Sequence, residues 1–525
     1  MNKEYEFLFP NRFHFDYKFE TNRGIFSFAK NISSSPPGYV ISKIFQNKPI
    51  WIFTLLILLL SFFLLFENQS PLYDQDEAAY AGFARTMVET SDYLNIHFAF
   101  SEPHRKPPLH FWLTSFIFQH LGVSEWNLRL LPSIWIIMSC ILTYLLGKSM
   151  FGEKVGLYSF CILGFSTYFP LNGKIALVDS LLTFIEILGF ISLYFFITKQ
   201  KQIFKFLFWF SIAVGTLTKG PPILIFLGGT CFLLLFQLKT REAIWKLQPF
   251  LFLPISLSPL LIWGFLVWQN TDGELIRWMV DWYILRRASN PVFGQAGPPG
   301  TYLLLFFITL FPWSLYYTKI LRDLWNILKK AYASIGSKQI FKTENNFETN
   351  FLYIGLIFSW LFYEFLASKL PSYPLAAYPL LSILIAKKME GVTTFFSFKN
   401  LFVFSIVWMV TIIIILLPWM NNKRFDTKTV AEKINRLELK TDSIYVNGNL
   451  GLPSLAYYLK TPLKEFEANY LTNKDDKFIL ATTNDLLLLN QLQTNILVVG
   501  GPYPIYAYDR NKTIELYVIK TSNNN

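Results

Sequence analysis

Charged residues are scarce in this chain: aspartate, glutamate, lysine and arginine together make up 16% of its 525 residues. A soluble globular protein carries about 25%, so this deficit excludes an ordinary soluble enzyme. Hydrophobic residues reach 53%, and aromatic residues alone reach 18%. They gather in repeated apolar runs, each long enough to cross about 30 Å of hydrocarbon. The sequence therefore predicts an α-helical polytopic membrane protein.

Cysteine is also rare, and Cys140, Cys161 and Cys231 all lie in apolar runs. We interpret them as small buried hydrophobic residues rather than disulfide partners or metal ligands. No nucleotide-phosphate loop, dinucleotide fingerprint or Ser-His-Asp order stands out. The net charge of +12 fits loops that face anionic membrane lipids better than it fits a nucleic-acid partner.

About eleven to thirteen membrane-spanning helices are predicted from the apolar runs. If the N-terminus is cytoplasmic, five short loops rich in lysine and arginine all face the cytoplasm, as the positive-inside rule requires. About 48 mixed polar residues precede the first span, which we therefore expect to act as an uncleaved membrane signal. The spans that can be placed are 49–66, 128–149, 154–170, 175–197, 203–219, 221–238, 249–268, 301–319, 351–368, 372–387 and 400–418.

The chain is expected to have three parts: a cytoplasmic extension at 1–48, a membrane domain at 49–418, and a small outer α/β domain at 419–525. In the last part, short buried strands alternate with helices, and Gly500-Gly501 is assigned to a turn. The expected strands are 443–446, 478–481 and 495–499, and the expected helices are 452–459 and 484–492.

Three acids, Asp74, Asp76 and Glu77, lie near the start of the long outer loop 67–127, shortly after the first span. Asp76 could simply cap a short helix that we expect from Glu77 to Thr90. Charged groups beside hydrocarbon are costly, however, and are usually retained for a task. We therefore favour a function, in which a carboxylate deprotonates an acceptor hydroxyl or holds a divalent cation.

A second acid on the outer face, Asp179, lies about one turn into the predicted span 175–197. It could pair with Lys174 or cap a kink, but its place near the outer end of the span favours a role in a site. Glu186 follows about two turns deeper on a similar face. We interpret Glu186 as a structural hydrogen-bonding partner.

Four groups of cations also fall on the outer face, against the positive-inside bias. Each alone is typical of a headgroup anchor, but together they indicate a site for a lipid-linked phosphate or pyrophosphate. The first group is followed by two prolines, which fix the direction of its side chains. After the prolines we expect an apolar helix, 109–121, which is too short to span the membrane and lies along its surface. The groups are Arg105-Lys106, Lys219, Arg286-Arg287 and Lys369.

A divalent metal ion is an open alternative, and no other cofactor is predicted. The outer loop contains His97, His104 and His110, but their spacing matches no helical pair of metal ligands. Carboxylates together with Glu102 would suit a hard cation. Glu102 and His104 are therefore the candidate ligands if a metal is required.

Several motifs follow one another along the chain: Asp76-Glu77-Ala78-Ala79-Tyr80, Arg85, Lys106-Pro107-Pro108-Leu109-His110-Phe111-Trp112, Arg129-Leu130-Leu131-Pro132-Ser133, Asp179, Thr218-Lys219-Gly220-Pro221 and Ser368-Lys369-Leu370-Pro371-Ser372-Tyr373. Jointly they resemble the GT-C integral-membrane glycosyltransferases. The resemblance is greatest to the bacterial lipid A aminoarabinose transferases, which are related to the protein O-mannosyltransferases. It covers roughly residues 50 to 390.

The resemblance implies a GT-C fold that transfers a sugar from a polyprenyl-phosphate donor on the periplasmic face of the bacterial inner membrane. Lipid A or another glycolipid is the expected acceptor, and a protein is the alternative. Asp76 would be the catalytic acid, with Glu77 beside it and Asp179 assisting. The phosphate-binding residues would be Arg85, Arg105, Lys106, Lys219, Arg286, Arg287 and Lys369, and Tyr80 and Tyr373 would line the substrate pocket.

One departure from that pattern is Arg105, which stands where the aminoarabinose transferases carry an acid before Lys-Pro-Pro. Their metal site and their sugar are therefore not carried over to this chain. The expected chemistry is a single, inverting displacement at the anomeric carbon, carried out by a monomer among membrane lipids. Three other classes stay open: a flippase of lipid-linked sugars, a ligase that joins whole glycans to the lipid A core, and a membrane scaffold.

Overall fold

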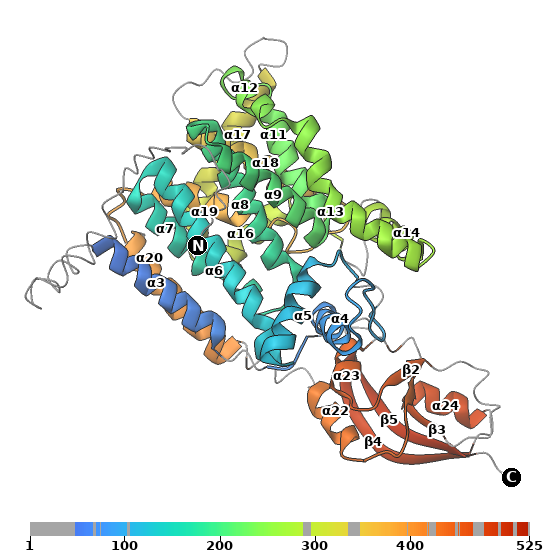
Figure 1. Cartoon of the computed structure of the whole chain (residues 1–525). Helices are drawn as coiled ribbons and strands as arrows, with labels where there is room; N and C mark the ends of the chain where they lie inside the picture. The colour runs from blue at the N-terminus through green and yellow to red at the C-terminus, as the bar shows by residue number, and fades with distance from the viewer. Residues whose placement is uncertain are drawn as a thin grey trace, which may run out of the picture. The chain divides into compact units, whose positions relative to one another are not determined.

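The computed structural model is mainly helical, with a small sheet near the C-terminus (Figure 1). An α-helical polytopic membrane protein with a C-terminal α/β domain is therefore confirmed as the fold class. The structure describes residues 48–66, 70–73, 75–101, 105–286, 296–333, 347–395, 397–416, 418, 427–446, 450, 452–465, 477–491, 495–507 and 512–522.

Most of the predicted spans correspond to helices. The helices of this part are α3 (Lys48–Leu65), α4 (Asp76–Thr90), α5 (Leu109–Leu121), α6 (Glu125–Phe151), α7 (Glu153–Gly164), η2 (Pro170–Gly173), α8 (Val178–Lys199), α9 (Gln202–Lys219), α10 (Pro221–Ile223), η3 (Leu224–Gly228), α11 (Gly229–Leu234), α12 (Leu238–Lys246), α13 (Pro249–Asn270), α14 (Glu274–Val280), η4 (Asp281–Arg286), α16 (Thr301–Thr309), η5 (Trp313–Tyr316), α17 (Tyr317–Ala333), α18 (Phe347–Ser359), η6 (Leu361–Phe365), α19 (Ala377–Met389), α20 (Phe398–Thr411) and η7 (Ile412–Leu416).

Within the described residues, four helices are long and apolar enough to cross a membrane, judged by length and composition. The prediction of eleven to thirteen spans is thus confirmed only in part. The four are Glu125–Phe151, Val178–Lys199, Pro249–Asn270 and Phe398–Ile415, and two shorter apolar helices are Ile50–Leu65 and Pro221–Leu234.

The predicted span 301–319 is wrong, because the chain breaks in its middle. Helix α16 ends at Thr309, and Pro312 directly precedes the short helix η5. Proline has no backbone N–H to continue a helical ladder, which favours the break. The helix that follows, α17, is amphipathic: it buries Tyr317 and Ile320 while Trp325 stays exposed.

The predicted span 351–368 also ends early, at Ser359, where α18 gives way to η6. The change of direction places the buried Glu364 against the start of α16. Its carboxylate accepts hydrogen bonds from the backbone N–H groups of Gly300 (2.8 Å) and Leu303 (2.9 Å) and from Trp360 Nε1 (3.0 Å). Glu364 therefore satisfies helix-end donors that otherwise have no intrahelical partner.

The C-terminal domain is a five-stranded mixed sheet in the order β2-β1-β3-β5-β4. Strand β1 is parallel to β2 and β3, whereas β5 is antiparallel to β3 and β4. Its elements are α22 (Thr427–Asn435), β1 (Ile444–Val446), α23 (Pro453–Tyr458), β2 (Leu463–Glu465), β3 (Lys477–Thr482), α24 (Thr483–Gln491), β4 (Asn495–Ala507) and β5 (Lys512–Ser522).

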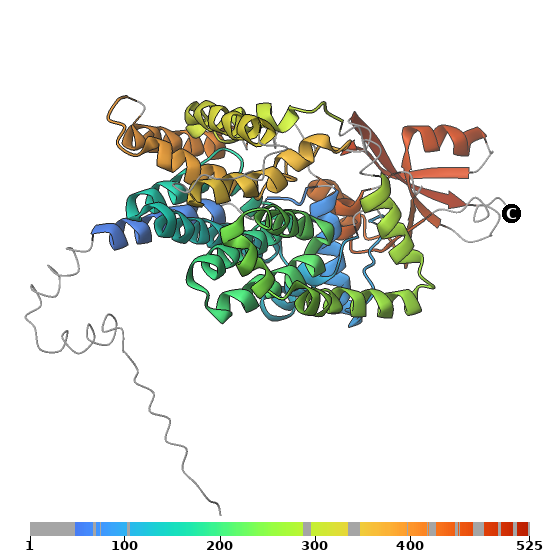
Figure 2. The same cartoon turned by 90° about the horizontal axis from the view of Figure 1, so that it is seen from above.

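Successive side chains of β3 pack into two different cores, one on each face of the sheet. Leu480 joins the core under α22 and α23, while Ile479 and Ala481 pack with Leu489 of α24 on the opposite face. Successive side chains of a strand point to opposite faces, which is why one short strand serves both cores. The helices lie on both sides of the strands in Figure 2.

The predicted turn at Gly500-Gly501 is wrong, and strands β2 and β5 were not predicted. Both glycines lie inside β4, where the pairing with β5 is irregular between Val498 and Tyr503. Gly501 has φ +111°, a conformation that glycine adopts without steric cost. The two glycines therefore mark a bulge in a long strand, and not its end.

Candidate active site

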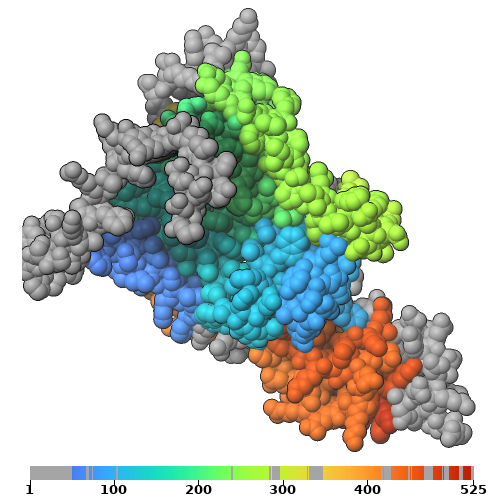
Figure 3. All heavy atoms as spheres, in the orientation of Figure 1, coloured from blue at the N-terminus to red at the C-terminus, as the bar shows by residue number. Residues whose placement is uncertain are grey.

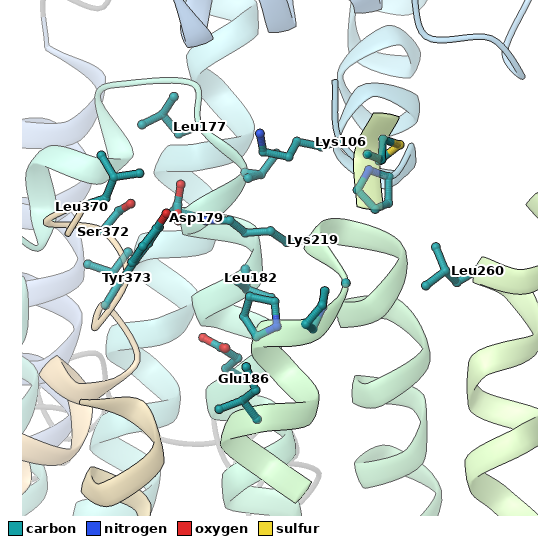
Figure 4. A pocket seen from close by; sticks show the side chains of 18 of the residues that line it. Lys106, Leu177, Asp179, Leu182, Glu186, Lys219, Leu260, Leu370, Ser372 and Tyr373 are labelled. Atoms are coloured by element: carbon teal, nitrogen blue, oxygen red, sulfur yellow. Dashed lines mark hydrogen bonds and ion pairs between the residues drawn. The ribbon is translucent and has the colours of Figure 1, made fainter. Parts of the chain in front are cut away.

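A cavity of about 990 Å³ lies among α4, the residues before α5, α8, the turn after α9, the α13–α14 hairpin and the segment before α19. Its lining is polar at one end and apolar along the remaining wall. Figure 4 shows the polar end, where Lys106, Asp179, Lys219 and Tyr373 approach one another from different segments. Four of the charged residues that the sequence singled out, Asp76, Lys106, Asp179 and Lys219, thus line one cavity.

Asp179 and Lys219 form the ion pair of this cavity, with Oδ1 and Nζ 2.6 Å apart. Asp179 lies in the first turn of α8 and Lys219 is the last residue of α9. These are the helix ends at which the macrodipole favours an acid and a cation respectively. Gly220 then ends α9 with φ +80°, and Lys219 Nζ lies 5.6 Å from the centre of the Tyr373 ring. The alternative that Asp179 pairs with Lys174 is wrong.

Asp76 and Tyr80 line the same cavity from the first turns of α4, and Lys106 lines it from the segment before α5. Residues four apart lie on the same face of a helix, so Tyr80 faces the cavity together with Asp76. The Tyr80 ring packs at 5.7 Å from His110 and at 5.3 Å from Phe111. The expected helix Glu77–Thr90 and the expected helix 109–121 therefore appear as α4 and α5, and together they hold one side of the site.

His110 supports this side of the site as a neutral imidazole. It is buried behind Tyr80, and burial lowers the pKa of His110 to about 4. A group with that pKa carries no charge near neutral pH.

The apolar wall of the cavity was not foreseen from the sequence. It comes from α13 and α14, for which the sequence predicts only a span and an outer loop. Leu261, Phe265 and Val280 on these helices are among the exposed large hydrophobic residues. The wall consists of Leu260, Leu261, Trp263, Phe265, Trp268, Ile276, Met279 and Val280.

Glu77 lies in a closed network rather than in the cavity. Its carboxylate accepts hydrogen bonds from Arg129 Nε and Nη2, both at 2.8 Å, and from the backbone N–H groups of Tyr73 and Ala176, both at 2.9 Å. Arg129 also donates to the oxygens of Ser70. This network joins the start of the outer loop to α6 and to Ala176, which lies just before α8. The contacts of Glu77 are therefore structural.

Lys369 is buried and does not line the cavity. Its Nζ donates to the backbone oxygens of Glu364 (2.9 Å), Leu366 (2.5 Å) and Tyr363 (3.4 Å). Burial lowers the pKa of Lys369, and the Glu364 carboxylate acts in the opposite direction. The lysine therefore fastens the turn that carries Tyr373, which does line the cavity.

The remaining predicted cations lie elsewhere. Arg85 pairs with Glu89 at 2.6 Å and donates to the backbone oxygen of Tyr457. Arg286 is exposed and pairs with Asp281 at 2.7 Å. Arg105 is partly buried and, like Arg85 and Arg286, is not among the lining residues. Asp74, Glu102, His104 and Arg287 fall outside the residues that the structure describes.

Glu186 lines the cavity, as do the tyrosines Tyr168 and Tyr363, which were not predicted from the sequence. Among the described residues, no side chain or backbone group hydrogen-bonds to the Glu186 carboxylate. The interpretation of Glu186 as a structural hydrogen-bonding partner is therefore wrong. Its spacing of seven residues from Asp179 was the available signal, because that spacing keeps both acids on one face.

Comparison with known proteins matches these features. The family model for dolichyl-phosphate-mannose-protein mannosyltransferases matches residues 105–263, which include Lys106, Asp179 and Lys219. A crystal structure of ArnT from Cupriavidus metallidurans bound to undecaprenyl phosphate superposes with a TM-score of 0.70, at 16% identity, over 90% of this chain and 97% of that one. The chain has the GT-C fold. The predicted resemblance to GT-C glycosyltransferases of the ArnT and protein-mannosyltransferase type is confirmed.

Two relatives are similar to this chain in sequence. An uncharacterized protein of Aquifex aeolicus (strain VF5) is 25% identical over 69% of this chain and 68% of its own length. The undecaprenyl phosphate-alpha-4-amino-4-deoxy-L-arabinose arabinosyl transferase of Wigglesworthia glossinidia brevipalpis is 24% identical over 66% of this chain. The match spans 59% of the length of that transferase.

Proposed function

We propose that this GT-C protein transfers a sugar from a polyprenyl-phosphate donor to lipid A or another glycolipid, on the periplasmic face of the bacterial inner membrane. The observation that carries the proposal is the composition of the cavity. Two lysines and three acids line the cavity, and apolar side chains of α13 and α14 form one wall of it. Such a cavity suits a ligand with a phosphate head and a hydrocarbon chain.

The names of the similar proteins support the same class of donor. The ArnT structure contains undecaprenyl phosphate, and the Wigglesworthia relative is named for an undecaprenyl-phosphate-linked sugar. The positive-inside pattern of the loops supports a cytoplasmic N-terminus, and with it a polar cavity end that faces the periplasm.

Lys106 and Lys219 are the proposed phosphate-binding residues. Both line the cavity at its polar end, and a lysine stabilises negative charge that builds up on a departing phosphate. Asp179 is a positioning residue, because its contact with Lys219 Nζ holds that ammonium group in place at the C-terminal end of α9. Tyr373 adds an aromatic face beside the same ammonium.

The proposed reaction is one displacement at the anomeric carbon. An acceptor hydroxyl oxygen bonds to C1 while the bond from C1 to the phosphate oxygen breaks, so the configuration at C1 inverts. Asp76 takes the proton of the acceptor hydroxyl. The leaving group is the polyprenyl phosphate, which carries away the bonding electron pair as negative charge next to Lys106 and Lys219.

A metal has no ligand set among the described residues, where no three His, Cys, Asp or Glu side chains come together. Arg105 also stands where the aminoarabinose transferases carry an acid. The candidate ligands Glu102 and His104 lie outside the described residues, so a divalent metal ion stays an open alternative. Arg286 and Arg287 stay proposed contacts of the lipid phosphate, from the segment that follows α14.

A protein acceptor is the second candidate. The matching family model describes enzymes that transfer mannose from dolichyl phosphate to protein, and the cavity lining does not distinguish a glycolipid hydroxyl from a serine or threonine hydroxyl. The donor half of the reaction is the same in both cases.

Lipid and glycan mass spectrometry of deletion cells tests both candidates. Cells complemented with wild type are expected to regain a sugar on lipid A or another glycolipid, whereas Asp76→Asn is expected to slow transfer by about 10²- to 10⁴-fold. Glu89→Gln is the matched control, because it removes an exposed acid from the same helix. Altered glycoproteins with unchanged lipids would select the protein acceptor, and wild-type transfer by Asp76→Asn would refute the proposed role of Asp76.

A further inference from the structure

Glu186 is a buried acid that the proposed reaction does not yet use. Its side chain is 4% exposed and lies within the apolar helix α8, seven residues after Asp179. Seven residues correspond to nearly two helical turns, about 10 Å of rise. Figure 4 shows Glu186 beyond Asp179 and Leu182 on the side of α8 that borders the cavity.

The surroundings of Glu186 leave its carboxylate without compensation. Within the part of the chain that the structure describes, it accepts no hydrogen bond and forms no ion pair. The cation that influences it most, Lys219, is in contact with Asp179 at 2.6 Å. A buried carboxylate without a partner is costly, and chains keep such groups where a ligand supplies the missing contacts.

We propose that Glu186 binds the transferred sugar by accepting hydrogen bonds from its ring hydroxyls, and so determines which sugar this enzyme accepts. The proposal rests on the proposed function, because it places the sugar of the lipid-linked donor in the same cavity. It adds a binding role for a residue deeper than the phosphate-binding lysines.

The geometry fits a donor whose phosphate lies against Lys106 and Lys219. Helical side chains lean toward the N-terminus of their helix, so the Glu186 carboxylate is directed back toward Asp179 and the polar end. A carboxylate has two oxygens and several acceptor positions, which allows it to receive two neighbouring hydroxyl groups of one ring. Thr183 and Tyr363 line the cavity as well and add hydroxyl groups to its lining.

A site of this kind discriminates strongly. An apolar wall cannot tell one hydroxyl pattern from another, whereas a buried group that needs a hydrogen-bond donor rejects ligands that lack it. The apolar wall from α13 and α14 would accept any polyprenyl chain, so the choice of sugar falls to Glu186.

Binding measurements separate the sugar from its lipid carrier. The purified full-length protein in nanodiscs is titrated with undecaprenyl phosphate, with undecaprenyl-phosphate mannose and with the undecaprenyl-phosphate aminoarabinose named for the Wigglesworthia relative. Wild type is expected to bind at least one sugar-bearing lipid more tightly than the bare lipid phosphate. Glu186→Leu is expected to lose that preference by about 10- to 100-fold and to keep its affinity for undecaprenyl phosphate.

Two further variants make the result specific. Glu186→Gln retains an acceptor oxygen and is expected to keep part of the preference. Glu153→Gln removes an acid that pairs with Lys148 outside the cavity and is expected to bind like wild type. Without ligand, Glu186→Leu is expected to melt no lower than wild type, because it removes an uncompensated acid.

An unchanged sugar preference in Glu186→Leu would overturn the inference. A second combination of results would also overturn the inference: a large drop in the melting temperature of Glu186→Leu together with weaker binding of undecaprenyl phosphate by Glu186→Gln. That combination would identify Glu186 as a structural acid. Failure of wild type to bind undecaprenyl phosphate at all would instead refute the proposed function, so the two failures are distinguishable.

Discussion

Two ion pairs of the membrane domain have similar contact distances but different surroundings. Glu77 with Arg129 and Asp179 with Lys219 are both short, at 2.8 Å and 2.6 Å. The side chains of Arg129 and Glu77 are 0% and 1% exposed, whereas those of Lys219 and Asp179 are 15% and 10% exposed. The first pair is sealed in protein, and the second borders the cavity.

The difference lies in what surrounds each carboxylate. Glu77 accepts from two guanidinium N–H groups and from two backbone N–H groups, which fills its acceptor capacity. A complete network of this kind makes its part of the fold rigid. Asp179 and Lys219 have the cavity on one side, so a ligand can reach them. The first pair therefore stabilises the fold, and the second is open to a ligand.

The largest expected effect is on the sealed pair. Arg129→Met leaves Glu77 as a buried charge without its main partner, which costs about 3–5 kcal/mol. We expect a steep loss of folded protein, measured as the yield and apparent melting temperature of the detergent-solubilised chain. Activity per folded molecule should change far less than the yield.

The double variant Glu77→Leu with Arg129→Met sharpens this test. Removing both charges should recover part of the loss, because no unpaired charge remains. Recovery should stay incomplete, since the backbone N–H groups of Tyr73 and Ala176 lose their acceptor. Normal stability in the single Arg129→Met variant would contradict the structural role of the sealed pair.

The pair at the cavity should respond in the opposite way. Lys219→Gln keeps a hydrogen-bond donor for Asp179 but removes the positive charge, so we expect transfer to slow by about 10²- to 10³-fold with a melting temperature close to that of wild type. Lys174→Gln is the matched control: its Nζ donates to the backbone oxygens of Phe63 and Phe66 and does not line the cavity. Equal rates for Lys219→Gln and Lys174→Gln would remove Lys219 from the proposed mechanism.

The contrast between the two pairs also explains how far the sequence could be interpreted. Charges next to apolar runs are visible in a sequence, so the amino-acid order alone is enough to select Asp76, Lys106, Asp179 and Lys219. The partner of each charge is not visible, because it depends on long-range packing. Glu77 therefore looked like Asp76, and only the fold shows that Arg129, 52 positions away, occupies it.

The same limit applies to the fold. Apolar runs predicted most helices and the buried strands β1 and β3, since periodicity and length are local properties. The break of the span 301–319 at Pro312 and the use of Glu364 to cap α16 depend on contacts between distant segments. The apolar wall of the cavity was missed for a related reason: an exposed leucine in a membrane helix looks the same whether it faces lipid or a cavity.

The smallest expected effect concerns the join between the C-terminal domain and the outer loop, whose surfaces meet in Figure 3. Tyr458 Oη accepts from the backbone N–H of Leu72 at 2.9 Å and donates to Glu125 Oε1 at 3.1 Å. Lys428 contacts the same Glu125 oxygen at 2.6 Å.

Tyr458→Phe removes both hydroxyl contacts, which should cost about 1–2 kcal/mol at the loop that leads into α4 and Asp76. Hydrogen exchange at the Leu72 amide should become faster, and transfer should fall only a few-fold. Tyr517→Phe is the control, because its hydroxyl donates to Glu515 at an exposed position of the same domain. If exchange at Leu72 is equally slow in both variants, the hydroxyl of Tyr458 does not brace the loop.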